Sequence, residues 1–203
     1  MTAGQFRKRA LLIGGFCSVV FVVIACSFFL PMLFFPETSA ASLRRFSNSE
    51  SRLPVIVTVY GRSSDTISAS IAFYTAEGDL FGTLERSWPG WELKLDCVLI
   101  ANSSGWIVFP YQVSTDATAE GRGINLVRYY NDSGLPVIYD SLRLRSDEQK
   151  ALKRLFFIVR SEEWMPSFLG HLYHQTLTVR SFRENVEYSL YIDSAGKLSI
   201  RSN

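Results

Sequence analysis

Histidine and cysteine, the residues that most often carry metal or nucleophilic chemistry, are scarce in this chain. The 203 residues include two histidines, His171 and His174, and three cysteines. Cys17 and Cys26 lie within a long apolar run, so Cys97 has no partner in the rest of the chain for an intrachain disulfide, although pairing between chains stays possible. Because its neighbours in sequence are apolar, we expect Cys97 to be buried, with a raised pKa and without nucleophilic character.

Acidic residues are absent from the first 36 positions, and a strong net charge is absent from the rest of the chain. Three of the 21 basic residues occupy positions 7–9, which leaves 18 basic against 19 acidic residues beyond them. A nucleic-acid-binding domain normally carries a clear basic excess on one face. We therefore expect no nucleic-acid partner.

Recognisable catalytic and cofactor motifs are also absent. The glycine-rich loop Gly121-Arg122-Gly123 lacks the Lys-Ser/Thr pair of a P-loop and does not complete the dinucleotide pattern. His171 and His174 lie three residues apart in a segment expected to be a strand, where that spacing points them to opposite faces and does not favour a metal site. We assign no catalytic, cofactor or metal residue, but a site assembled in space leaves no sequence signature.

A long apolar segment dominates the N-terminal part. Residues 11–35 contain no charged side chain and are rich in Leu, Ile, Val and Phe. A helix of about 25 residues is roughly 37 Å long, which exceeds the hydrocarbon thickness of about 30 Å. We predict a transmembrane helix here whose regular part ends near Pro31. The basic residues at 7–9 predict a cytoplasmic N terminus, a plasma (inner) membrane location and a periplasmic or extracellular remainder.

Two processing events are alternatives to an uncleaved signal anchor. Residues 38–42 are small enough for a signal peptidase, and Cys26 is a candidate for lipidation. The apolar segment is much longer than the 7 to 15 or so residues typical of a signal peptide, and it continues beyond Cys26, so both features favour the anchor. Gly14 and Ser18 have the small-xxx-small spacing that permits a homodimer, without further support.

The remaining chain shows the pattern of one β-rich domain. Residues 1–10 form a basic cytoplasmic tip, residues 36–52 a linker rich in Ser, Arg and Asn, and residues 53–203 the folded part. Alternation at 66–74 predicts a strand, and strands are likewise predicted at 124–130 and 135–144 around the turn 131–134.

One helix is predicted near 146–163. Ser146 is its expected N-cap, and the apolar residues that follow share one face. Together these patterns predict a mainly β (α+β) fold with one antiparallel domain, either a sandwich, a curved sheet or an open barrel, and one packed α-helix.

The sequence Trp88-Pro89-Gly90-Trp91 is a turn by its chemistry and carries two indole rings. Exposed indoles on a turn would bind a ligand, a partner or a membrane interface, whereas buried indoles would cap a sheet. We take Trp88, Trp91, His171 and His174 as the candidate contact residues.

These observations favour a non-enzymatic envelope protein whose β-rich domain binds another envelope protein or an apolar ligand. Two alternatives stay open. One is a membrane-tethered hydrolase or peptidase with a spatially assembled site, and the other is a small-ligand sensor. No cofactor is expected for the non-enzymatic binding protein that these observations favour.

Overall fold

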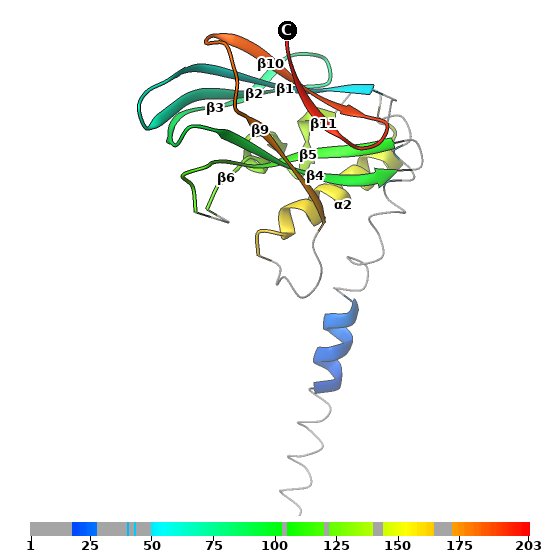
Figure 1. The fold of residues 1–203 in the computed structure, drawn as a ribbon. Coiled ribbons are helices and arrows are strands. Elements are labelled where there is room, and N and C mark those ends of the chain that lie inside the picture. Colours follow the sequence, from blue (N-terminus) through cyan, green and yellow to red (C-terminus); the bar gives the residue numbers. More distant parts are fainter. Residues whose placement is uncertain are drawn as a thin grey trace, which may run out of the picture. The chain divides into compact units, whose positions relative to one another are not determined.

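The structure is a computed structural model that describes residues 18–27, 40, 43, 50–102, 105–119, 122–139, 144–164 and 172–203. Two compact units divide the chain, Met1–Pro36 and Glu37–Asn203, and we describe each by itself. Figure 1 shows the second unit as a set of curved sheets with one long helix.

In the first unit residues 18–27 form a helix. Large apolar side chains are exposed at six consecutive positions, from Val19 to Ile24. Among the described residues no helix is both long and apolar enough to cross a membrane. The rest of the predicted span 11–35, with Gly14 and Pro31, and most of the segment 38–42 lie outside the described residues.

Five antiparallel strands form the larger sheet of the second unit, in the order β11-β10-β1-β2-β3. Alternation in the central strand explains its place, because Val55, Val57 and Val59 are fully or almost fully buried and their neighbours in sequence are less so. The central Val57 pairs with Ile71 on one side and Tyr188 on the other. The strands are β1 (Glu50–Arg62), β2 (Thr66–Tyr74), β3 (Leu80–Pro89), β10 (Val186–Asp193) and β11 (Leu198–Ser202).

Four antiparallel strands form a second sheet, in the order β6-β5-β4-β9. Its centre is the hairpin of Leu93–Asn102 and Gly105–Thr115, with Val98 opposite Phe109. Residues 97–100 and 107–110 are buried without alternation, so both faces of this hairpin are covered there. The strands are β4 (Leu93–Asn102), β5 (Gly105–Thr115), β6 (Ile124–Asn125) and β9 (Tyr173–Val179).

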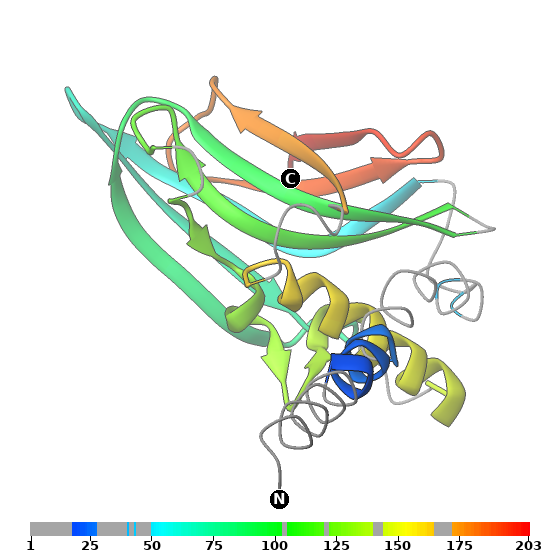
Figure 2. The same ribbon diagram turned by 90° about the horizontal axis from the view of Figure 1, so that it is seen from below.

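One hydrophobic core contains side chains from both sheets and from helix α2 (Ser146–Ser161). Aromatic rings connect these layers: Tyr130 lies 5.2 Å from Phe73 of β2 and 5.6 Å from Phe156 of α2, and Phe156 lies 6.0 Å from Phe109 of β5. In Figure 2, α2 runs across one side of the sheets. The prediction of a mainly antiparallel β-rich domain with one packed helix is confirmed for this unit.

The N-cap of α2 lies one residue earlier than predicted. The N-cap is Arg145, not Ser146, and the buried carboxylate of Glu148 accepts the backbone N–H of Arg145 at 2.9 Å. The apolar face was predicted correctly, since Leu152, Leu155 and Phe156 are fully buried. The predicted end at residue 163 is two residues too late.

The long strands predicted at 124–130 and 135–144 are wrong. The turn at Ser133-Gly134 is present, with positive φ at both residues, but its flanks are the two-residue strands β7 (Asn131–Asp132) and β8 (Leu135–Pro136). Short 3₁₀ turns, η2 (Val127–Tyr129) and η3 (Val137–Tyr139), replace the expected strand continuations, and residues 140–143 lie outside the described residues.

Two tyrosine hydroxyls bond the edge of β5 with which the longer predicted strands would have paired. The Tyr139 hydroxyl accepts the backbone N–H of Val108 at 2.9 Å and lies 2.6 Å from its carbonyl, and the Tyr130 hydroxyl donates to the carbonyl of Pro110 at 2.8 Å. These buried side chains satisfy backbone groups that a neighbouring strand would otherwise bond.

Candidate functional site

The three candidate contact residues that the structure describes, Trp88, Trp91 and His174, do not form one site. Trp88, at the end of β3, is buried with 4% of its surface exposed, whereas Trp91 is 52% exposed. His174 lies in β9 opposite Val98, while Trp91 precedes Leu93, which pairs with Val179 at the other end of β9. His171 lies outside the described residues. The burial alternative therefore holds for Trp88, and of the two indoles of this turn only that of Trp91 is exposed.

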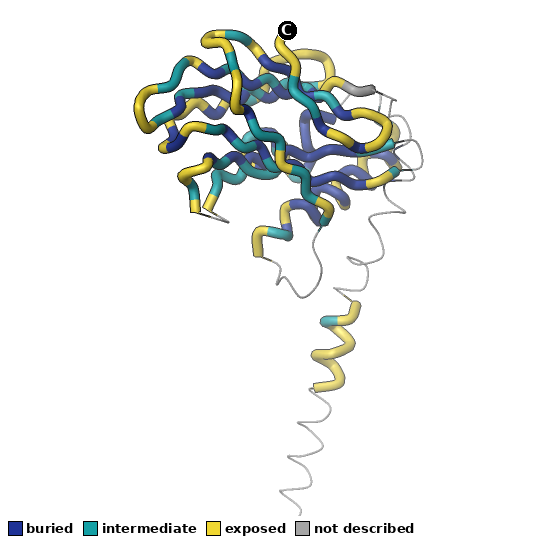
Figure 3. The backbone as a smooth tube through the Cα atoms, viewed as in Figure 1, coloured by how far each residue is buried: buried dark blue, intermediate teal, exposed yellow. Residues whose placement is uncertain are grey.

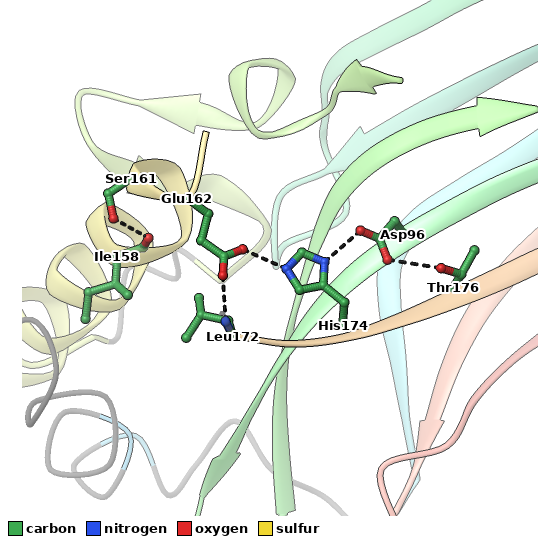
Figure 4. A network of polar contacts seen from close by, with 7 residues as sticks. All are labelled: Asp96, Ile158, Ser161, Glu162, Leu172, His174 and Thr176. Atoms are coloured by element: carbon green, nitrogen blue, oxygen red, sulfur yellow. Dashed lines mark hydrogen bonds and ion pairs between the residues drawn. The ribbon is translucent and has the colours of Figure 1, made fainter. Parts of the chain in front are cut away.

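His174 is held between two carboxylates from distant parts of the chain (Figure 4). Its Nδ1 lies 2.7 Å from Oδ2 of Asp96 in β4, and its Nε2 lies 2.7 Å from Oε2 of Glu162, which follows α2. The second oxygen of Glu162 accepts the backbone N–H of Leu172 at 2.6 Å, and that of Asp96 accepts the Thr176 hydroxyl at 3.2 Å. The network joins β4, β9 and the end of α2.

Both hydrogen bonds favour the protonated imidazole. The bonds to Asp96 and Glu162 raise the pKa of His174 from 6.5 to about 9, against the opposing effect of partial burial. Tyr111 packs edge-on against the imidazole, with the ring centroids 5.3 Å apart. Burial and the neighbouring carboxylates of Glu162, Glu163 and Asp96 raise the pKa of Tyr111 to about 12.

The His174 network connects β4, β9 and the end of α2. It is poorly suited to acid–base catalysis at neutral pH. A general base needs a free ring nitrogen, and both nitrogens of His174 donate to carboxylates. Asp96 and Glu162 lie at opposite ring nitrogens, so the three side chains do not surround one metal ion. Among the described residues no group of three or more His, Cys, Asp or Glu side chains has the arrangement of a metal site.

A second feature surrounds Trp91. The guanidinium carbon of Arg62 lies 5.6 Å from the centroid of the Trp91 ring and 4.9 Å from that of Phe182. Arg62 also donates to the carbonyl of Arg180 at 3.2 Å, and Arg180 is paired with Glu92 at 3.0 Å. We call Arg62, Trp91, Arg180 and Phe182 the loop cluster, because they lie at strand ends and in the connections between strands.

The turn that carries Trp91 is fixed by polar contacts. Oδ1 of Asp116 accepts the backbone N–H groups of Trp91 at 2.7 Å and Glu92 at 3.0 Å, and these bonds lower the pKa of Asp116. Gly90 has a φ of +116°, and a Cβ at this position would lie 2.5 Å from Oδ1 of Asp116. The turn therefore requires glycine at position 90, and its fixed backbone orients the exposed indole of Trp91.

The sequence analysis did not identify the residues that contact His174 or those that surround Trp91 in the loop cluster. Asp96 alternates with buried leucine in β4, a weak signal for a polar contact on one face of the sheet. No sequence signal relates Glu162 to His174 or Arg62 to Phe182. In contrast, Cys97 was predicted correctly, since it is a fully buried free thiol whose pKa is raised by burial.

Two candidates for function therefore emerge, the His174 network and the loop cluster. The first is saturated by its own hydrogen bonds, and the second exposes aromatic and basic groups to solvent. Comparisons of the chain with protein-family models, with curated proteins and with solved structures found no match.

Proposed function

We propose that this chain is a membrane-anchored, non-enzymatic protein whose β-rich unit binds another protein through the loop cluster. The observation that carries the proposal is the half-exposed indole of Trp91, held on a fixed turn beside the Arg62 guanidinium. Tryptophan and arginine are the residues most enriched among those that dominate binding energies at protein interfaces. A rigid turn also lowers the entropy that binding costs, because the indole is already oriented.

The position of the loop cluster suits contact with a partner. The described residues of the unit before β1 are Ala40 and Leu43, both buried, and Arg62 ends the 13-residue strand that begins at Glu50. A strand of this length spans about 40 Å, so Arg62 of the cluster lies far from Glu50, at the other end of β1. A partner bound at the loop cluster would leave the Glu50 end of β1 uncovered.

Membrane anchoring is supported by the apolar segment itself. Six consecutive apolar side chains, from Val19 to Ile24, are exposed on the helix formed by residues 18–27. At 100° per residue these six positions cover every face of the helix, which leaves no polar face for water. We propose that residues 11–35 span the plasma (inner) membrane with the N terminus in the cytoplasm, and that the β-rich unit lies in the periplasm or outside the cell.

The hydrolase alternative receives less support from the described geometry. Its best histidine, His174, has both nitrogens engaged by Asp96 and Glu162. An apolar-ligand site would need an enclosed apolar cavity, whereas the loop cluster is an open surface. The engaged nitrogens of His174 and the open surface of the loop cluster favour a protein partner over a substrate or an apolar ligand.

Crosslinking from intact membranes tests the proposal. We would crosslink and recover three versions of the protein: the full chain, a chain that keeps only residues 1–45, and the variant W91A. Mass spectrometry would identify the proteins captured by each. We expect the full chain to capture one protein that the chain of residues 1–45 does not capture. The captured amount should fall at least about 10-fold with W91A, as for a residue that dominates an interface.

The matched control is W164A. Trp164 is 57% exposed, close to the exposure of Trp91, but follows α2 outside the loop cluster. Capture should be unchanged in W164A. Equal capture by W91A and the unmodified chain, or equal loss in W91A and W164A, would contradict a contact through the loop cluster.

A further inference from the structure

A polar hollow of about 160 Å³ lies where η2 and the end of α2 meet, and nothing in the proposed partner contact uses it. Its lining comes from four segments that are separate in sequence: β6, η2, β7 and the end of α2 with the residues after it. The lining residues are Asn125, Val127, Arg128, Asn131, Arg160 and Glu163.

Hydrogen-bond donors dominate this hollow. Arg128 is restrained by a bond from its Nε to the carbonyl of Asn125 at 3.2 Å and by its position 5.5 Å from the centroid of the Tyr129 ring. This contact leaves the two terminal amino groups of its guanidinium to donate elsewhere. Oδ1 of Asn131 accepts the backbone N–H of Gly134 at 3.0 Å, so the side chain has its amide NH₂ left as a donor.

The charges in the hollow are unequal. Arg128 and Arg160 contribute two guanidinium groups, and Glu163 contributes one carboxylate. Two cations that line one hollow repel each other, and an oxyanion between them would remove that repulsion and accept bidentate hydrogen bonds. Glu163, which accepts a long hydrogen bond of 3.4 Å from Asn125, offers a separate acceptor for a positive group.

We propose that this hollow binds a small zwitterion, with its oxyanion on Arg128 and Arg160 and its ammonium group on Glu163. An α-amino acid and the phosphoethanolamine head group of a phospholipid share this chemistry. The volume is sufficient for one small organic ion and too small for a folded segment. The site does not depend on the loop cluster, so it stands whether or not Trp91 contacts a partner.

Isothermal titration calorimetry of the full chain in an uncharged detergent tests this site. Glycine and phosphoethanolamine serve as the zwitterionic probes, and inorganic phosphate and ethanolamine as probes that carry only one of the two charges. We expect saturable binding of at least one zwitterion, with affinity about 10-fold higher than that of either single-charge probe because each charged contact adds to binding. The stronger zwitterion distinguishes an amino acid from a lipid head group.

Three substitutions assign the contacts. R128Q and R160Q should each weaken zwitterion binding about 10-fold, the loss expected for one charge-assisted contact. E163Q should weaken binding of the zwitterion without weakening that of inorganic phosphate. The matched control is R86Q, which removes an exposed arginine of β3 outside the hollow and should leave binding unchanged.

The circular dichroism spectrum of each variant should match that of the unmodified chain, which separates loss of a contact from loss of the fold. The proposal is overturned if no probe binds at millimolar concentration, or if R86Q weakens binding as much as R128Q. Equal affinity for inorganic phosphate and phosphoethanolamine, unaffected by E163Q, would also overturn the zwitterion assignment.

Discussion

At the scale of single residues, His174 is the side chain on which most of the polar contacts converge. It connects Asp96 in β4 with Glu162 at the end of α2 through two hydrogen bonds of 2.7 Å. Its side chain is 28% exposed and that of Glu162 is 7% exposed, so the charges are only partly screened by water. The loss of the imidazolium would leave two neighbouring carboxylates without their shared cation.

We expect H174Q to lower the free energy of unfolding by about 2 kcal/mol at pH 6.5, less than for a fully buried ion pair because this one is partly solvated. The pKa of His174 is raised from 6.5 to about 9, so the stabilisation is complete below pH 6.5 and is lost as the pH rises through 9. The difference between the unmodified chain and H174Q should therefore shrink between pH 7 and pH 10. Denaturant unfolding at several pH values measures it.

The control on the same strand is T176V. It removes only the 3.2 Å hydrogen bond from Thr176 to Asp96 and keeps the imidazole. Its cost should stay below about 1 kcal/mol and show no matching loss between pH 7 and pH 10. A pH-independent difference for H174Q would show that His174 is neutral in the folded state and that the ion-pair interpretation is wrong.

At the scale of the elements, the approach of η2 to the edge strand β3 depends on one glycine. An ideal Cβ built at Gly82 would lie 2.4 Å from the carbonyl oxygen of Tyr129. Backbone atoms on both sides prevent an easy adjustment, unlike a contact with the end of a flexible side chain. Gly82 therefore allows η2 to cover β3, and it lies next to the exposed Leu80 and Phe81.

G82A is expected to destabilise the fold by about 2 kcal/mol, because the added methyl group must displace η2 or bend β3. G61A is the matched control, since Gly61 is also a strand glycine and its Cβ would meet only Glu184, at 3.6 Å. G61A should change the free energy of unfolding by no more than about 0.5 kcal/mol. Equal losses for both variants would indicate a general cost of replacing strand glycine and not a close approach at Gly82.

At the scale of the whole molecule, the chain divides into Met1–Pro36 and Glu37–Asn203. The second unit has its own core, which includes both sheets and α2. A unit with its own core is expected to fold without the apolar segment. The proposed anchor and the proposed binding surface can therefore be tested separately.

A chain that begins at residue 37 should appear in the soluble fraction and unfold in one cooperative transition. The full chain should sediment with membranes, resist extraction by high salt and be released by detergent, because its apolar segment would lie in the bilayer. Fractionation and thermal unfolding of both versions measure this. Recovery of the full chain in the soluble fraction would contradict the anchor.

Local patterns were sufficient for much of the β-rich unit. The alternation at 66–74 coincides with β2, and the burial of Cys97 follows from its apolar neighbours. Local patterns failed at 124–130 and at 135–139, the described start of the strand predicted to run to 144, where strand-forming residues adopt short turns. The competing interaction is tertiary, because the hydroxyls of Tyr130 and Tyr139 bond the edge of β5 that longer strands would have needed.

The sequence by itself determined the apolar segment, the antiparallel β-rich class and the helix near 146–163, because each depends on periodicity and turn chemistry between near neighbours. Only the tertiary structure decided that Trp88 is buried and Trp91 exposed, and that His174 meets Asp96 and Glu162. The physical reason is distance along the chain. Contacts between residues tens of positions apart depend on strand order and register, which local periodicity does not specify.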